Sequence, residues 1–109
     1  MEKGEIWIVN LPPTDFGREQ AGGRPGIFLA DAEIIGIVVP LTSNLLTLRF
    51  PFTLSIKPSS LNGLQEESVA LIFQIRALDK RRFLKRIGKL ESNALKSIDE
   101  TIIKMLQLK

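Results

Sequence analysis

Apolar residues in this chain of 109 residues alternate with polar ones in short runs, and prolines and glycines interrupt these runs along most of its length. Alternation with a period of two is typical of half-buried β-strands. Only the C-terminal end changes period, because Leu95, Ile98, Ile102, Met105 and Leu106 recur in steps of three and four. That spacing indicates one apolar helix face. The pattern therefore predicts a mainly β (β+α) fold that ends in a helix.

The runs predict five or six strands and one compact domain, 1–109. We expect strands at 4–11, 26–30, 34–41, from near 51 to 56, 68–78 and 86–90, with a tight connection at 31–33 and a turn at Asn62-Gly63. Asp79 is expected to cap a short helical turn, and Ser92 the final helix. Short strands joined by such turns close most easily into a small barrel, because closure leaves few unpaired edges.

Composition narrows the chemistry. The chain has no cysteine and no histidine, so it lacks disulfides, the usual proton shuttle and the usual ligands of zinc and copper. We expect no metal and no cofactor. No run approaches the ~20 apolar residues of a membrane span, and the N-terminus lacks the pattern of a signal peptide. A cytoplasmic protein without membrane contact is expected.

The formal net charge is only +3, but the charge is uneven. Residues 76–89 carry one acid, Asp79, and seven bases: Arg76, Lys80, Arg81, Arg82, Lys85, Arg86 and Lys89. Such a run either attracts an RNA backbone or an acidic peptide, or forms a solubilising helix face.

The stretch 18–26, REQAGGRPG, contains three glycines and one proline. These residues disfavour a helix and a central strand, so a loop is predicted. Arg24 stands before Pro25, which restricts its backbone. A guanidinium presented from there suits two parallel hydrogen bonds to a phosphate, or an ion pair with Glu19 that holds the loop.

Five segments in order resemble the MazF/PemK family of toxin endoribonucleases: GEIWIVNL, EQAGGRP, PLTS, RFPFTLSI and SVALIFQIRALDKRRF. The resemblance covers nearly the whole chain. It implies a small SH3-like barrel of the CcdB/PemK type and a homodimer. It also implies metal-independent, sequence-specific cleavage of single-stranded RNA within a toxin-antitoxin module, with a cognate antitoxin that carries an acidic, partly disordered segment.

Such cleavage proceeds when the RNA's own 2'-hydroxyl attacks the adjacent phosphate, so the site must handle two protons and stabilise phosphate oxygens. With the resemblance, Arg24 and Thr42 are the expected catalytic residues: Arg24 stabilises the charge, and the Thr42 hydroxyl donates from a strand end. Glu19 either accepts the 2'-proton or supports Arg24. Thr42 is equally a common strand residue. The expected RNA-binding residues are Arg18, Gln20, Ser43 and Gln74.

The chain departs from the family at three points. The connection at 31–33 is short, Phe73 stands where glutamate is common, and the segment 44–49 is more apolar and includes a leucine cluster that could be a partner surface. These changes affect the RNA sequence preference and the antitoxin contacts. The alternatives are a non-catalytic RNA- or peptide-binding dimer and a gyrase-poisoning toxin. The latter type depends on a tryptophan near its C-terminus, whereas this chain ends in MLQLK and contains only Trp7.

Overall fold

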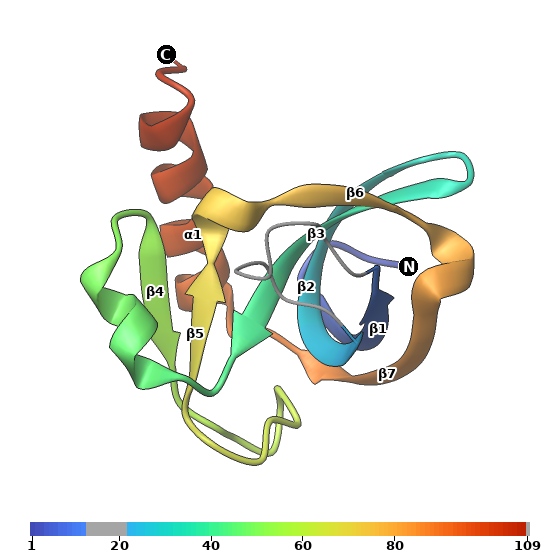
Figure 1. Cartoon of the computed structure of the whole chain (residues 1–109), viewed down its shortest axis with the longest axis horizontal. Helices are drawn as coiled ribbons and strands as arrows, with labels where there is room; N and C mark the ends of the chain where they lie inside the picture. Colours follow the sequence, from blue (N-terminus) through green and yellow to red (C-terminus); the bar gives the residue numbers. More distant parts are fainter. Residues whose placement is uncertain (13–21, 109) are drawn as a thin grey trace.

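The protein is a curled antiparallel sheet with one helix packed against it (Figure 1). A computed structural model describes residues 1–12 and 22–108. Within these residues the elements are β1 (Glu5–Leu11), β2 (Gly22–Ala32), β3 (Ile35–Thr42), the 3-10 turn η1 (Leu45–Arg49), β4 (Thr53–Ile56), β5 (Ser68–Leu71), η2 (Ile72–Gln74), β6 (Arg76–Asp79), η3 (Lys80–Arg82), β7 (Phe83–Lys89) and α1 (Ser92–Met105).

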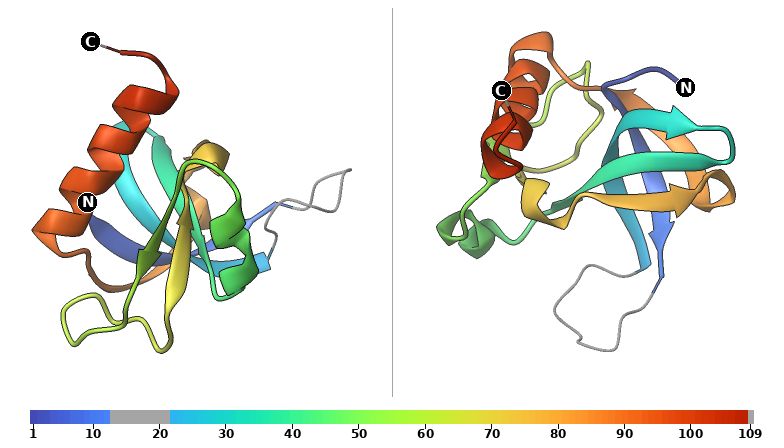
Figure 2. Two further views of the ribbon diagram at one scale, coloured as in Figure 1. Left: turned by 90° about the vertical axis from the view of Figure 1, so that its left-hand side faces the viewer. Right: turned by 90° about the horizontal axis from the view of Figure 1, so that it is seen from above.

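The strand order is β4-β5-β3-β2-β1-β7, and β6 also pairs with β3. All the pairs are antiparallel. The first half of β3, residues 35–38, pairs with β6, whereas Leu41 and Thr42 pair with β5. Because β5 and β6 meet β3 at different points, the sheet curls into a half-barrel (Figure 2). The predicted mainly β fold with a C-terminal helix is confirmed.

Two apolar clusters form the core. The first lies between the sheet and α1 and includes Ile6, Leu41, Ile72 and Ile98. The second includes Val9, Leu11, Phe28 and Phe83, with Trp7 packed against it. Alternation along β1 explains the division, because successive side chains of a strand point to opposite faces. The alternation in the sequence, which puts Ile6 on one face of the strand and Trp7, Val9 and Leu11 on the other, therefore matches the two apolar faces of β1.

The predicted strand 68–78 is wrong in one respect, because η2 divides it into β5 and β6. Both pieces pair with β3, but with different halves of it. The chain must turn a corner between them to follow the curled sheet. A continuous aliphatic run does not reveal this corner, since residues on both sides of it are equally suited to a strand.

The predicted loop 18–26 is also wrong at its C-terminal end, because β2 already begins at Gly22 and contains Arg24 and Pro25. Pro25 pairs with Ile8 of β1, while the pairing of β2 with β3 begins only at Gly26. At this position β2 is therefore an edge strand, where proline is tolerated.

Several boundaries differ from the predictions. The turn of the β2-β3 hairpin lies at 33–34 rather than 31–33, β4 begins at Thr53, and β7 covers Phe83–Lys89 rather than 86–90. Ser92 is the first helical residue and not the cap, since Glu91 occupies the N-cap position. The Asp79 carboxylate does cap η3 by accepting from the Arg81 N–H at 2.8 Å.

The helix packs as its periodicity predicts. Leu95, Ile98, Ile102 and Met105 belong to the cluster beneath it. Leu106 differs, because it is the C-cap residue beyond the last turn and is 54% exposed. In the described part of the chain, no helix is long and apolar enough to cross a membrane.

Candidate functional site

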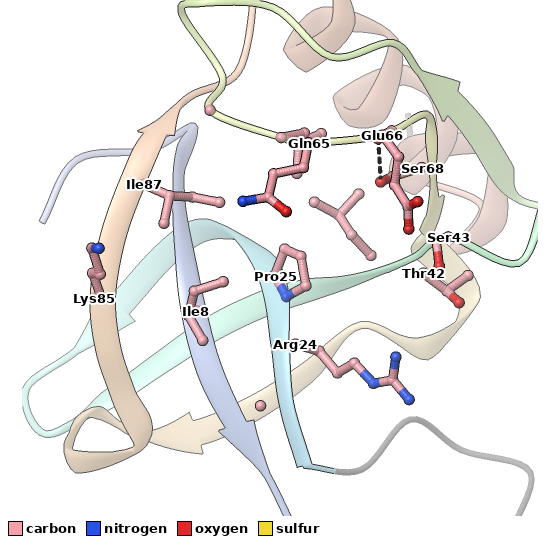
Figure 3. Close-up of a pocket in the computed structure, with 14 residues that line it drawn as sticks. Ile8, Arg24, Pro25, Thr42, Ser43, Gln65, Glu66, Ser68, Lys85 and Ile87 are labelled. Carbon is pink, nitrogen blue, oxygen red and sulfur yellow. Dashed lines mark hydrogen bonds between the residues drawn. The ribbon is translucent and has the colours of Figure 1, made fainter.

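The β2-β3 pairing brings Arg24 and Thr42 into one neighbourhood. Gly26 of β2 pairs with Pro40 of β3. Arg24 lies two residues before Gly26, and Thr42 lies two residues after Pro40. Arg24 and Thr42 therefore both lie just beyond the end of the β2-β3 pairing. Figure 3 shows the Arg24 side chain extending from β2 on the side of the site where Thr42 and Ser43 lie.

A pocket of about 480 Å³ opens at this edge of the sheet. It is lined by Ile8, Gly23, Arg24, Pro25, Leu41, Thr42, Ser43, Gly63, Leu64, Gln65, Glu66, Ser68, Lys85 and Ile87 (Figure 3). Arg24, Thr42 and Ser43, three of the residues singled out from the sequence, thus line one cavity.

The hydroxyl of Thr42 has a fixed position. Thr42 is the last residue of β3 and is 6% exposed, and its Oγ1 accepts a hydrogen bond from the Asn44 N–H at 3.2 Å. Because a hydroxyl both accepts and donates, the bond to Asn44 leaves its proton available to a ligand oxygen. Ser43 is exposed beside it. The strand end therefore presents two hydroxyl groups to the pocket.

The floor of the pocket is an apolar part of the sheet. Ile8 of β1 pairs with Pro25 on one side and with Lys85 of β7 on the other. Lys85 is exposed and lies on the far side of the pocket from Thr42 (Figure 3). The cavity therefore has cations on two sides of an apolar floor, with Arg24 contributed by β2.

The opposite wall comes from the β4-β5 connection, which contributes Gly63, Leu64, Gln65 and Glu66. The Asn62-Gly63 turn predicted from the sequence lies here, and Gly63 has a φ of 71°. Gln65, Glu66 and Lys85 were not predicted as site residues from the sequence. The Asn62-Gly63 pair predicts a turn, but it does not predict which strand that turn will pack against.

Buried Asn62 holds this wall in place, together with Ser59 and Glu91. The Asn62 Nδ2 donates to Glu91 Oε1 at 3.1 Å, and the Ser59 hydroxyl donates to Glu91 Oε2. The bond from Ser59 is the largest influence on the Glu91 carboxylate and lowers its pKa. Burial opposes this effect, and the Asn62 bond adds to it. An ionised Glu91 thus joins the start of α1 to the pocket wall.

The other predicted site residues lie elsewhere. Gln74 is not a lining residue of the pocket; it ends η2, and its buried Oε1 has no hydrogen-bond partner within the part of the chain that the structure describes. The predicted roles of Arg18, Glu19 and Gln20 fall outside the described residues.

The basic run 76–89 forms β6, η3 and β7, so the alternative of a solubilising helix face is wrong. Much of its charge is paired with acids, as in Lys80–Asp31 at 2.6 Å and Arg81–Asp79 at 2.9 Å. The Arg81 side chain, which hydrogen-bonds Asp79, lowers the pKa of that carboxyl to about 2. These pairs are exposed and contribute little to stability. Lys85 is the basic residue of this run that lines the pocket.

The leucine cluster of 44–49 forms η1, in which Leu45, Leu46 and Leu48 are all exposed. The neighbouring rings of Phe50 and Phe73 lie 5.8 Å apart between centroids and are also partly exposed. No three His, Cys, Asp or Glu side chains gather into a possible metal site among residues 1–12 and 22–108.

The arrangement suits a phosphodiester. A guanidinium binds phosphate oxygens through parallel hydrogen bonds, and hydroxyl groups beside it can donate to an oxygen of the same group. An apolar floor next to these groups can receive an unstacked base. The pocket therefore combines contacts for the backbone and for the bases of a nucleic acid strand.

Comparison with known proteins agrees with this chemistry. Residues 2–106 match the family model described as PemK-like, MazF-like toxin of type II toxin-antitoxin system. The chain is 33% identical to Endoribonuclease MazF9 of Mycobacterium tuberculosis over 94% of its own length and 92% of that protein.

Solved structures share the fold. A crystal structure of MazF from Deinococcus radiodurans matches with a TM-score of 0.80 and 24% identity, over 99% of this chain and 97% of that one. A MazE-MazF crystal structure from the same organism matches with a TM-score of 0.76 and 23% identity, over 100% and 97% of the two chains.

Proposed function

This chain belongs to the PemK-like, MazF-like toxin family of type II toxin-antitoxin systems, and on that premise we propose that it is an endoribonuclease that cleaves single-stranded RNA. The observation that carries the proposal is the shared pocket of Arg24 and Thr42. In this proposal, residues 1–109 form a single toxin domain. mRNA, the proposed substrate, is cytoplasmic, and so is the proposed site of action.

The proposed reaction needs no metal. The 2'-oxygen of one nucleotide attacks the adjacent phosphorus and loses its proton, while the bond from phosphorus to the 5'-oxygen breaks and that oxygen gains a proton. The products are a 2',3'-cyclic phosphate and a 5'-hydroxyl. Arg24 stabilises the negative charge that gathers on the phosphate oxygens, because its guanidinium stays protonated at working pH. The same permanence makes it a poor general base.

Thr42 is proposed to donate its hydroxyl to a phosphate oxygen or to the departing 5'-oxygen. Its bond from Asn44 supports this role, since it orients Oγ1 while leaving the proton available. The acceptor of the 2'-proton stays a prediction: Glu19 takes it or supports Arg24.

The proposed partners are single-stranded RNA, a second copy of the chain and an antitoxin with an acidic segment. The family description supports an antitoxin partner. The MazE-MazF structure supports it further, because that complex pairs a toxin of the same fold with its antitoxin. Exposed leucines of η1 and exposed cations such as Lys85 offer apolar and basic contacts for an acidic, partly apolar peptide.

The proposal is tested by incubating the purified protein with a long single-stranded RNA in excess chelator. We expect cuts that leave 5'-hydroxyl ends and that disappear when the nucleotide before the cut is 2'-deoxy. Binding without cutting would instead support the non-catalytic RNA-binding dimer.

Arg24→Ala should lower the cleavage rate by at least ~100-fold, as expected when one donor to a charged transition state is removed. Arg81→Ala is the matched control, because Arg81 is an exposed arginine that pairs with Asp79 outside the pocket. Single-turnover rates at saturating RNA measure both variants. Equal rates for Arg24→Ala and the wild type would remove Arg24 from the mechanism.

A further inference from the structure

We propose that Gln65 and Glu66 select the bases beside the cleaved bond, and that buried Asn62 positions them. The inference rests on the proposed ribonuclease function, since it concerns the specificity of the same pocket. It assigns sequence selection to the wall formed by the β4-β5 connection.

Both side chains are exposed and line the pocket that contains Arg24 and Thr42. In Figure 3 the Gln65 amide extends over the floor of the pocket, above Ile8 and Pro25, whereas the Glu66 carboxylate lies on the side of Thr42. An RNA strand whose phosphate lies at Arg24 would therefore have its neighbouring bases close to these two side chains.

The chemistry of Glu66 favours contact with a base. A carboxylate beside a phosphate site repels the RNA backbone and weakens binding, so it does not serve backbone affinity. It accepts hydrogen bonds only, so it can bind the donors of base edges, which are the amino groups of cytosine, adenine and guanine and the ring N–H groups of guanine and uracil. The Gln65 amide both donates and accepts, which suits a mixed base edge such as that of adenine.

Asn62 supplies the rigidity that selection requires. It is 0% exposed and uses every hydrogen-bonding position of its amide. Its Oδ1 accepts from the N–H groups of Ser59 and Leu64, both at 3.0 Å. Its Nδ2 donates to the Lys57 carbonyl at 2.9 Å and to Glu91 at 3.1 Å. These four bonds hold the turn from both ends.

The backbone of the turn is also fixed against β7. The Lys89 N–H donates to the Leu61 carbonyl at 3.0 Å. A Cβ on Gly63 would lie 2.1 Å from the Ile87 carbonyl oxygen, so the turn contacts the strand at the residue after Asn62. Gln65 follows two positions later. The backbone just before Gln65 is therefore fixed against β7, which limits the base edges that the Gln65 side chain can contact.

Glu66→Gln tests the selection against a matched control, Glu67→Gln. Both variants remove one negative charge from neighbouring positions. Glu67 does not line the pocket. Its carboxylate instead accepts a hydrogen bond from the Ser55 hydroxyl at 2.6 Å. Each protein is incubated in excess chelator with an RNA pool randomised along its length, and the 5'-hydroxyl ends are sequenced.

At one position beside the cut, we expect the ratio of nucleotide frequencies for Glu66→Gln to differ from that of the wild type by at least ~5-fold, the lower bound for one base contact. The direction is toward uracil, which has two carbonyl oxygens and no amino group, because the glutamine amide can donate to those oxygens. Glu67→Gln should keep the wild-type preference. A uniform increase in rate with unchanged preference would mean that Glu66 is only a solvated charge, and would overturn the inference.

The positioning role is tested with Asn62→Ala and with the milder Ser59→Ala, which removes one hydroxyl from the same network. Both should relax the preference at the positions that Glu66 and Gln65 read. A lower melting temperature with the wild-type preference would show a purely structural role and overturn this part.

If the wild type cuts no RNA, the ribonuclease proposal fails. If the wild type cuts RNA and Glu66→Gln has the same nucleotide preference, only the present inference fails.

Discussion

At the scale of single residues, Thr42 serves the fold and the proposed chemistry with the same hydroxyl. Its β-branched side chain suits the end of β3, and its Oγ1 accepts from Asn44. This double use explains why the sequence alone supports both a structural and a catalytic interpretation. Variants that separate shape from hydrogen bonding can distinguish them.

Thr42→Val keeps the shape and removes the hydroxyl. We expect the cleavage rate to fall by ~10-fold or more if the hydroxyl donates in the transition state. The free energy of unfolding should fall by only about 1 kcal/mol, the usual contribution of one hydrogen bond. Thr42→Ser retains the hydroxyl and should keep most of the rate. Single-turnover kinetics and urea unfolding measure the two effects, and a Val variant as active as the Ser variant would contradict the catalytic role.

At the scale of elements, the β4-β5 connection is held by side chains rather than by a strand ladder. The carboxylate of Glu91 receives bonds from Ser59 and Asn62 and therefore links the first turn of α1 to this connection. These bonds favour the charged form, which is why the pKa of Glu91 lies below its ordinary value of 4.5. The link should weaken when the carboxylate is protonated.

The pH dependence of stability follows from this shift. Because the folded state holds Glu91 at a lowered pKa, the unfolded state binds the proton more readily. The stabilisation is therefore present above pH 4.5, the ordinary value, and is lost as the pH falls through the lower folded value. Urea unfolding of the wild type and of Glu91→Gln should show a stability difference that narrows below pH 4.5. A difference independent of pH would contradict the link.

Element boundaries show what local patterns can and cannot predict. Alternation identified β1 and both of its faces, and a 3.6-residue period identified α1. The break at η2 and the early start of β2 were missed. In both cases the deciding factor is pairing with a distant strand, which overrides the local preference of glycine, proline or aliphatic residues.

At the scale of the whole molecule, α1 packs against the curled sheet through one apolar cluster (Figure 1). Ile98 is 0% exposed and belongs to the cluster that also contains Leu41 and Ile72. The helix therefore depends on residues from β3 and η2 for its burial, and these two elements depend on the helix. Packing of this kind, rather than helix propensity, stabilises a helix of 14 residues.

Ile98→Ala should lower the free energy of unfolding by about 2–5 kcal/mol, because it leaves a cavity between α1 and the sheet. Ile103→Ala is the matched control in the same helix, since Ile103 is 43% exposed. A truncation that leaves no cavity should cost well under 1 kcal/mol. Urea unfolding followed by Trp7 fluorescence measures both. Similar losses for the two variants would contradict the packing of α1 described here.

The sequence by itself determined the fold class, the faces of β1 and α1, and the chemical types in the proposed site, since these depend on local periodicity and on the properties of single residues. It also identified Arg24, Thr42 and Ser43 as candidates. Only the tertiary structure decided that these residues share a pocket with Gln65, Glu66 and Lys85, because that depends on the register of β2 with β3 and on where the β4-β5 turn packs. Register and packing arise between segments far apart in the chain, and no local pattern contains them.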